Sequence, residues 1–268
     1  MLNKLTSLAF ISALSFMPMA LAQTPAISAG GIVNAASFAA GQPVAPGSLV
    51  AIFGNDLAPG LAQADSVPLS TSLANVSVTF NGVAAPLDFV AAGQINAQVP
   101  YEMGPGTANV IVTRNNVASA ATPVVVNAVA PGVFAAGTHA IAIIATDPSD
   151  PRYGTLAAPL GSIPGLPTNP AKVNDILIVY ATGLGPVTPA VLSGHDSLDQ
   201  LRTTVLTPTA LINNVPAPVF FSGLTPQFPG VYQLNVGVPQ VPAGDAVPLQ
   251  VQVSGLTSPP TPTIAVGL

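Results

Sequence analysis

The sequence contains no cysteine and no tryptophan, and only 6% of its 268 residues are charged. A chain without cysteine forms no disulfide, so its stability must come from a buried core. Five Lys and Arg residues against ten Asp and Glu residues give a formal net charge of −5. Because such a chain has no basic patch for phosphate backbones, nucleic acid is not an expected partner.

Long helices and long apolar runs are also missing from the pattern. The 30 Pro and 24 Gly residues interrupt the chain too often for long helices, but they suit short strands joined by turns. Almost half of the residues are hydrophobic, yet the apolar runs after Ala22 are short, as in residues 176–181. None approaches the roughly 18 residues that a membrane-spanning helix needs. Buried strands explain the hydropathy better, and we predict an all-β protein.

The first 22 residues have the pattern of a secretory signal peptide. Lys4 precedes an apolar run at residues 5–21, and residues 20–22 place small side chains where a signal peptidase reads them. We therefore expect cleavage before Gln23 and a location in the periplasm, on the cell surface or outside the cell. The alternatives are an uncleaved amino-terminal helix and a lipoprotein, and lipidation would require a cysteine.

An internal repeat is the most informative feature of the sequence. Three blocks recur in the same order, pairing residues 49–59 with 176–186, 81–87 with 213–219, and 94–100 with 233–239. The offset between the copies grows from 127 to 132 and then to 139. Growth of this kind is expected when two copies share their strands and differ in loop length. The repeat therefore predicts two related domains.

Hydrophobic residues within the blocks recur with a period of two. In residues 76–81 and 94–99, apolar and polar side chains alternate, which is typical of an antiparallel sheet with one buried face. Asn81-Gly82 indicates a tight type I′ hairpin, because both residues tolerate positive φ, and Asn213-Asn214 has the same place in the second copy. Further strands are predicted at residues 108–114, 123–127, 140–146, 247–253 and 261–266.

Short strands in copies of about 100 residues favour immunoglobulin-like β-sandwiches over a barrel or a propeller. We predict two tandem sandwiches after the signal peptide, at residues 23–128 and 173–268. Residues 129–172 have two interpretations that the sequence leaves open. They are a connecting hairpin followed by a Pro/Gly-rich linker, or a hairpin that belongs to one of the sandwiches.

Five segments also carry a family resemblance: residues 31–38, 46–57, 81–101, 130–134 and 180–185. Together they resemble the uncharacterised carboxy-terminal domain family of exported proteins from Solibacter-like Acidobacteria, over nearly the whole mature chain. That family has no established activity, so the resemblance implies no catalytic or binding residue. Each half also resembles IPT/TIG immunoglobulin-like domains, which implies the fold and a surface or interaction setting.

Residue types suited to catalysis are few and scattered. Glu102 is the only glutamate, and His139 and His195 lie far apart in a chain without cysteine, so a zinc site is not expected. Residues 193–196, Ser-Gly-His-Asp, contain the types of a catalytic triad. In a triad, however, the side chains of the nucleophile, the base and the third residue point at one another, and adjacent residues of one loop cannot adopt this geometry. We predict no enzymatic activity and no cofactor.

Two candidates for ligand sites remain. Asp147 and Asp150 are the pair for a calcium site, but calcium needs about five or six oxygen ligands, and Asp before Pro is typical of an ordinary turn. For carbohydrate, Tyr101 and Tyr153 are the candidate stacking residues, whereas Tyr180 and Tyr232 are interpreted as core. Polar side chains at outward strand positions are candidates for hydrogen bonds to a sugar: Gln94, Asn96, Gln98 and Asn235.

We thus predict a non-catalytic, exported module for binding, adhesion or assembly, whose partner is an extracellular or cell-surface protein or polysaccharide. Exposed strand edges also permit self-assembly by strand addition, although prolines block most uncontrolled pairing. The alternatives are a carbohydrate-binding module and an extracellular polysaccharide hydrolase or lyase. The enzyme would require acidic or histidine side chains that converge in one cleft.

Overall fold

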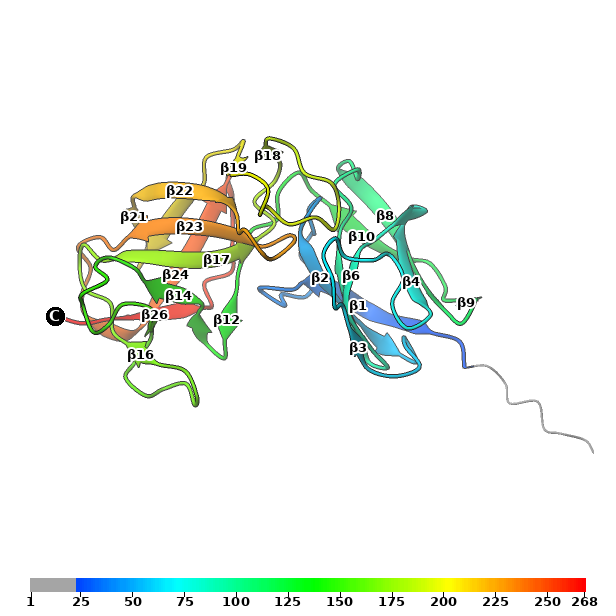
Figure 1. Cartoon of the computed structure of the whole chain (residues 1–268), viewed down its shortest axis with the longest axis horizontal. Coiled ribbons are helices and arrows are strands. Elements are labelled where there is room, and N and C mark those ends of the chain that lie inside the picture. The colour runs from blue at the N-terminus through cyan, green and yellow to red at the C-terminus, as the bar shows by residue number, and fades with distance from the viewer. Residues whose placement is uncertain (1–22) are drawn as a thin grey trace, which may run out of the picture.

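The computed structural model describes residues 23–268, and these form strands, turns and loops (Figure 1). The all-β prediction is confirmed. The predicted signal peptide, residues 1–22, lies outside the described residues. Within residues 23–268 no helix has the length and apolar character to span a membrane.

The first sandwich consists of two sheets. One has the strand order β1 (Ala26–Asn34), β2 (Leu49–Asn55), β7 (Gln94–Gln98), β6 (Leu87–Ala91) and β3 (Ala62–Gln63). The other has the order β10 (Thr122–Val126), β8 (Gly106–Arg114), β4 (Val76–Phe80) and β5 (Val83–Ala84), with β9 (Val117–Ala118) beside β8. Their facing side chains form one core that includes Ile52, Phe80, Ile95 and Val110.

The second sandwich repeats this plan with more strands. One sheet has the order β16 (Thr168–Asn169), β15 (Leu156–Ala157), β14 (Ala142–Ile144), β17 (Ile176–Thr182), β23 (Tyr232–Gly237), β22 (Val219–Leu224), β19 (Thr203–Thr204) and β18 (Val187–Thr188), and β11 (Gly132–Val133) also pairs with β17. The facing sheet has the order β12 (Ala135–Ala136), β13 (His139–Ala140), β26 (Thr263–Val266), β24 (Gly244–Val253), β20 (Thr209–Ile212) and β21 (Val215–Ala217), with β25 (Leu256–Thr257) beside β24. A separate core fills this sandwich.

The two copies pair their strands in the same register. Ala51 faces Asn96 between β2 and β7, and Ile178 faces Asn235 between β17 and β23. These residues are related by the offsets 127 and 139 of the sequence repeat. The same β-bulge interrupts β6 in the first copy and β22 in the second. The internal repeat is therefore a structural repeat.

The predicted hairpins occur at the expected positions. Asn81 and Gly82 join β4 to β5 with φ angles of 46° and 83°, and Asn213 and Asn214 join β20 to β21 with 52° and 61°. Two successive positive φ angles are the mark of a type I′ turn. The turn twists in the sense of its strands, so it fixes their register.

Residues 129–172 pair with the second sandwich. Strands β11 and β14 pair with β17 in the same way as the two ends of β1 pair with β2. The β12–β13 hairpin is inserted in the chain between β11 and β14. Strands β15 and β16 extend the same sheet beyond β14.

The two sandwiches meet through loops of the second, which reach toward the first (Figure 1). Gln98, at the end of β7, is fully buried in this contact. Its side-chain oxygen accepts a hydrogen bond from the Gly194 N–H at 2.6 Å, and its amide nitrogen donates to the Gly47 carbonyl at 3.1 Å. Gln98 thus ties together two backbones that are far apart in sequence.

Thr182 makes a second tie at the end of β17. Its buried hydroxyl accepts a hydrogen bond from the Leu49 N–H at 2.9 Å and donates to the Gly230 carbonyl at 2.7 Å. Nearby, Ser193 accepts from the Tyr101 N–H and donates to Glu102, each at 2.9 Å. We call the contact made by Gln98, Thr182 and Ser193 the joint.

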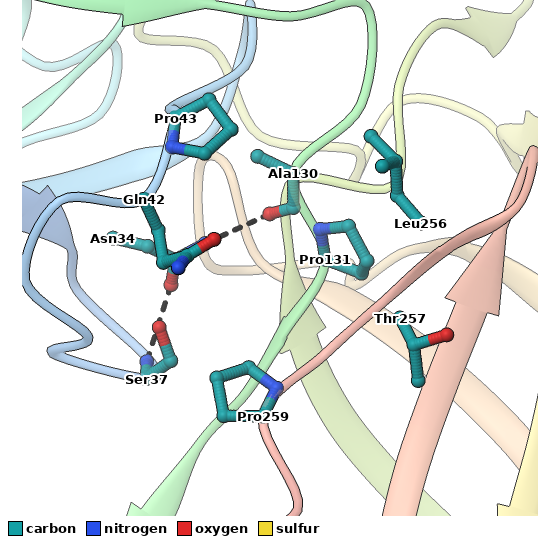
Figure 2. Close-up of a pocket in the computed structure, with 9 residues that line it drawn as sticks. All are labelled: Asn34, Ser37, Gln42, Pro43, Ala130, Pro131, Leu256, Thr257 and Pro259. Carbon is teal, nitrogen blue, oxygen red and sulfur yellow. Dashed lines mark hydrogen bonds between the residues drawn. The ribbon is translucent and has the colours of Figure 1, made fainter.

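Asn34 fixes the point where the chain passes from one sandwich to the other (Figure 2). Its amide nitrogen donates to the Ala130 carbonyl at 2.9 Å, and its side-chain oxygen accepts from the N–H groups of Ala36 and Ser37. The Asn34 amide lies so close to Gly132 that no Cβ fits there. The pocket beside Asn34 has a volume of only about 70 Å³. The contacts of Asn34 with Ala130 and Gly132 thus hold the two chain segments close together.

Candidate functional site

A cleft of about 410 Å³ lies beside the joint, between the two sandwiches. The first sandwich contributes Leu49, Leu69 and Asp88 to its lining, and the second contributes Phe134, Ile141, Tyr180, Phe228, Pro229 and Val231. Most of these side chains are apolar, three are aromatic, and one is charged. A largely apolar concavity with a few polar groups is the usual form of a ligand site.

One wall of the cleft is built around Tyr180 on the outer face of β17. The Phe134 N–H donates to the Tyr180 carbonyl, the Ile141 N–H to the Phe134 carbonyl, and the Tyr180 N–H to the Ile141 carbonyl, at 2.7 to 3.1 Å. Phe134 and Ile141 flank the inserted β12–β13 hairpin. The insertion therefore leaves both residues next to Tyr180, where all three line the cleft.

The same place in the first sandwich is closed. Phe53, the repeat partner of Tyr180, also faces the interruption of the first strand, because β1 breaks its register between Ile27 and Ile32. There the ring of Phe38 covers Phe53, with the centroids 6.2 Å apart. In the first copy Phe38 thus occupies the space beside Phe53, whereas in the second copy the equivalent residue, Tyr180, faces the cleft.

The opposite wall is the loop at residues 225–231, between β22 and β23. The Val231 N–H donates to the Phe228 carbonyl at 3.2 Å, and the Thr225 hydroxyl donates to the same carbonyl. Gly230, with φ of +74°, packs against Gly47 of the first sandwich, where a side chain would be strained. The loop is anchored at its tip, and the Phe228 ring remains 58% exposed.

Asp88 on β6 is the charged residue of the cleft. Its carboxylate is half-buried and has no hydrogen bond or ion pair with the described residues. Burial raises the pKa of Asp88 above 3.8, because the charged form loses water and gains no partner. The arginines at residues 114, 152 and 202 are instead paired with other aspartates.

The structure separates the two tyrosines that the sequence singled out. Tyr153 is 46% exposed on a turn and does not line the cleft. The Tyr101 ring packs on Gly47, where no Cβ fits, and its hydroxyl is buried. Burial raises the pKa of Tyr101 to about 12, although Tyr232 and Arg202 lower it. Tyr101 therefore packs in the joint, with its ring against Gly47.

The two remaining tyrosines also differ. The prediction of a core position is confirmed for Tyr232, which is fully buried and donates its hydroxyl hydrogen bond to the Gly185 carbonyl. For Tyr180 the prediction is wrong, because its ring is half-buried and lines the cleft. It aligns with Phe53 as expected, but both rings lie on the outer face of their sheets.

Asp147 and Asp150 are engaged in local contacts. Asp147 accepts hydrogen bonds from the Ser149 N–H and hydroxyl, each at 2.8 Å. Asp150 is paired with Arg152, which also contacts Asp175 at 2.6 Å. In residues 23–268 no group of three or more His, Asp or Glu side chains is placed to hold a metal ion.

Acid is expected to lower the melting temperature through these carboxylates. Hydrogen bonds from Ser149 lower the pKa of Asp147, those from Arg152 lower that of Asp150, and those from Arg202 lower that of Asp199 to about 2. Because the pKa of each carboxyl group is lower in the folded state than the value of 3.8 in the unfolded state, its ionised form stabilises the fold above pH 3.8. This stabilisation is lost as the pH falls toward 2. Asp88, with its raised pKa, contributes in the opposite sense.

Circular dichroism melts between about pH 5 and pH 2 measure this decline. The Asp147→Asn and Asp199→Asn double variant is the control, and its melting temperature should depend less on pH. A wild-type melting temperature that stays constant over this range would contradict the pairing described for these residues.

Other polar candidates lie away from the cleft. Gln94 and Gln233 each donate a hydrogen bond to the Asn two residues further along, Asn96 and Asn235, on the outer faces of the two sheets. Within residues 193–196, Ser193 is bonded to Glu102 and Gly194 to Gln98. The loop thus belongs to the joint, and its residues are not arranged as a triad.

One wall of the cleft corresponds to a change in the repeat offset, which is visible in the sequence. The repeat offset grows from 132 to 139 between β22 and β23. The extra residues are the loop at 225–231, which carries Phe228 and forms one wall. The change of offset shows where one copy has an insertion. It does not show which way the inserted loop points, because that is determined by contacts in the joint.

Comparison with known proteins agrees with the fold. Residues 32–126 match the family model of the IPT/TIG domain. None of the curated proteins matches the chain.

Solved structures resemble the chain only distantly. They include the surface glycan-binding protein SGBP-B of the Bacteroides ovatus mixed-linkage glucan utilization locus, in complex with a mixed-linkage heptasaccharide (10% identity, TM-score 0.34, 84% of this chain and 43% of that one). The extracellular region of plexin A4, domains 1 to 8, has 11% identity and a TM-score of 0.29 over 91% of this chain and 18% of that one. PbSGBP-B from Prevotella bryantii has 10% identity and a TM-score of 0.27 over 88% and 41%. The chain thus spans less than half of each, and these values transfer no ligand to it.

Proposed function

We propose that this chain is a non-catalytic, exported binding module that holds its ligand in the cleft between the two sandwiches. The observation that carries the proposal is the composition of the cleft. Aromatic and apolar residues from both sandwiches line the cleft together with Asp88, whose carboxylate has no partner among the described residues. Buried apolar surface supplies binding free energy, and an unpaired polar group supplies selectivity.

The content of the cleft favours binding over catalysis. A glycoside hydrolase or lyase needs two acidic or basic groups that converge on one bond. The cleft offers Asp88 and the Tyr180 hydroxyl, and neither His139 nor His195 lines it. The alternative of a polysaccharide hydrolase or lyase therefore has less support.

The setting of the module follows from the sequence. The pattern of residues 1–22 supports export, and the match of residues 32–126 to the IPT/TIG domain is consistent with a surface or interaction role. We assign residues 23–128 to one domain, and we join the former connector, 129–172, to the second because its strands pair there. Membership in the acidobacterial carboxy-terminal family is part of the proposal and rests on the five segments named above.

Removing an aromatic ring from the cleft is expected to weaken binding by about tenfold or more, as loss of an anchoring ring does at other interfaces. Tyr180→Ala and Phe228→Ala test this in residues 23–268, screened on a glycan array and in an envelope-protein pull-down, with and without calcium. Both rings are partly exposed, so the melting temperature should change little.

Phe220→Ala is the matched control, since Phe220 is 64% exposed on β22 and does not line the cleft. Its binding should equal that of the wild type. If the retained ligand is lost with Tyr153→Ala but kept with Phe228→Ala, the ligand binds elsewhere and the proposal fails.

A further inference from the structure

Asp88 gives the cleft a single formal charge without a counterion. The other lining residues are neutral. Three of the four Lys and Arg residues in the described chain, at 114, 152 and 202, already form internal ion pairs. A carboxylate that is half-buried and unpaired costs folding free energy, and an incoming cation removes that cost.

The three aromatic residues complement a cation as well. Phe134 and Tyr180 are joined by a backbone hydrogen bond on one wall, and Phe228 lies on the loop at residues 225–231. Aromatic faces attract Lys and Arg heads through the ring quadrupole, and more strongly where water is excluded. Leu49 and Ile141 supply apolar surface of the kind on which the methylene stem of such a side chain packs.

From this arrangement we infer that the cleft receives a lysine or arginine side chain of a partner protein. The inference rests on the proposed function, because it names the ligand class of the same cleft. The aromatic rings take the stem and the head of the side chain, and the Asp88 carboxylate pairs with its charge. The joint holds both walls in place before binding, which reduces the entropy lost on association.

A sugar fits this cleft less well. Each pyranose ring brings several hydroxyl groups, and each hydroxyl that leaves water without a partner costs free energy. The side chains of the cleft offer Asp88 and the Tyr180 hydroxyl as partners, and the remainder is apolar. A second copy of this chain is also a poor source of the cation, because only Lys172 has no ion pair among its described basic residues.

Two acetylated, amidated tripeptides test the inference: Gly-Lys-Gly and Gly-norleucine-Gly, which share a stem and differ in the charge. They are titrated into residues 23–268 while amide chemical shifts are recorded by NMR. The lysine peptide should shift the amides of Asp88, Phe134 and Tyr180 in a saturable way, with about tenfold higher affinity than the norleucine peptide. Its affinity should fall with added salt.

Asp88→Asn should lower the affinity for the lysine peptide by about tenfold and bring it to that of the norleucine peptide. Because the charged form of Asp88 opposes folding at neutral pH, the variant should melt at the wild-type temperature or above it. Asp245→Asn is the control: this residue is exposed on β24, lies outside the cleft and the joint, and its loss should leave the affinity unchanged.

Equal affinity for the two peptides, or saturation of the cleft by a neutral oligosaccharide but not by the lysine peptide, would overturn the inference and leave the binding function standing. If neither probe shifts the cleft amides, and the ligand from the screen is unaffected by Phe228→Ala, both the inference and the proposed function fail.

Discussion

Replacing Arg152 with methionine will lower the free energy of unfolding by about 3 kcal/mol, because the buried Asp175 carboxylate loses its cationic partner and keeps only the hydrogen bonds from Thr146 and Lys172. The Arg152 guanidinium donates to Asp150 and to Asp175, and the Asp175 side chain is only 7% exposed. Methionine keeps most of the packing volume of the arginine side chain, so the loss of stability measures the contribution of the charge. Urea denaturation followed by circular dichroism measures it.

Arg114→Met is the control for this variant. Arg114 lies 3.8 Å from Asp56, whose side chain is 37% exposed, and a pair of this kind contributes about 0 to 1 kcal/mol. If the two variants lose the same stability, the Arg152 cluster does not stabilise the fold as described.

Calcium provides a separate check on the same cluster. The Asp150 oxygens are held by Arg152 and those of Asp147 by Ser149, so calcium chloride should leave the wild-type melting temperature unchanged. A rise that disappears in Asp147→Asn would restore the calcium site that these two aspartates suggest in the sequence.

Replacing Gln98 with alanine is expected to cost about 2 to 4 kcal/mol, since it leaves the Gly194 N–H and the Gly47 carbonyl buried without partners. The Gln98 side chain is fully buried in the joint. We also expect the variant to melt in two transitions, because its two cores lose their main polar tie. Differential scanning calorimetry measures both effects.

Gln94→Ala is the matched control, on the same strand and the same face as Gln98. Gln94 is partly exposed and bonds only to Asn96, so its loss should change stability by about 0.5 kcal/mol or less. A single unchanged transition in Gln98→Ala would mean that the joint does not couple the sandwiches.

Much of the fold follows from the sequence because the signals are local. The alternation at residues 76–81 and 94–99 determines which strand faces are buried, and Asn81-Gly82 determines one hairpin and its register. The repeat then carries these assignments to the second copy, down to the bulge shared by β6 and β22.

The cleft does not follow from the sequence, because it depends on how the two copies meet. Gln98 has the position of an outward polar residue, yet the loop around Gly194 covers it. Tyr180 aligns with Phe53 but lacks the covering ring that Phe38 provides in the first copy. The contact between Gln98 and Gly194 joins residues 96 positions apart, and no period or spacing encodes it.

The joint is expected to make one rigid body of the two sandwiches, with a preformed cleft between them. The absence of cysteine allows spin labels to be placed without background at Val83→Cys and Val215→Cys, which are exposed and equivalent in the two repeats. Pulsed electron paramagnetic resonance then measures the distance between the labels. We expect a single narrow distribution that broadens in Gln98→Ala, whereas a broad distribution in the wild type would mean that the joint leaves the two sandwiches free to move.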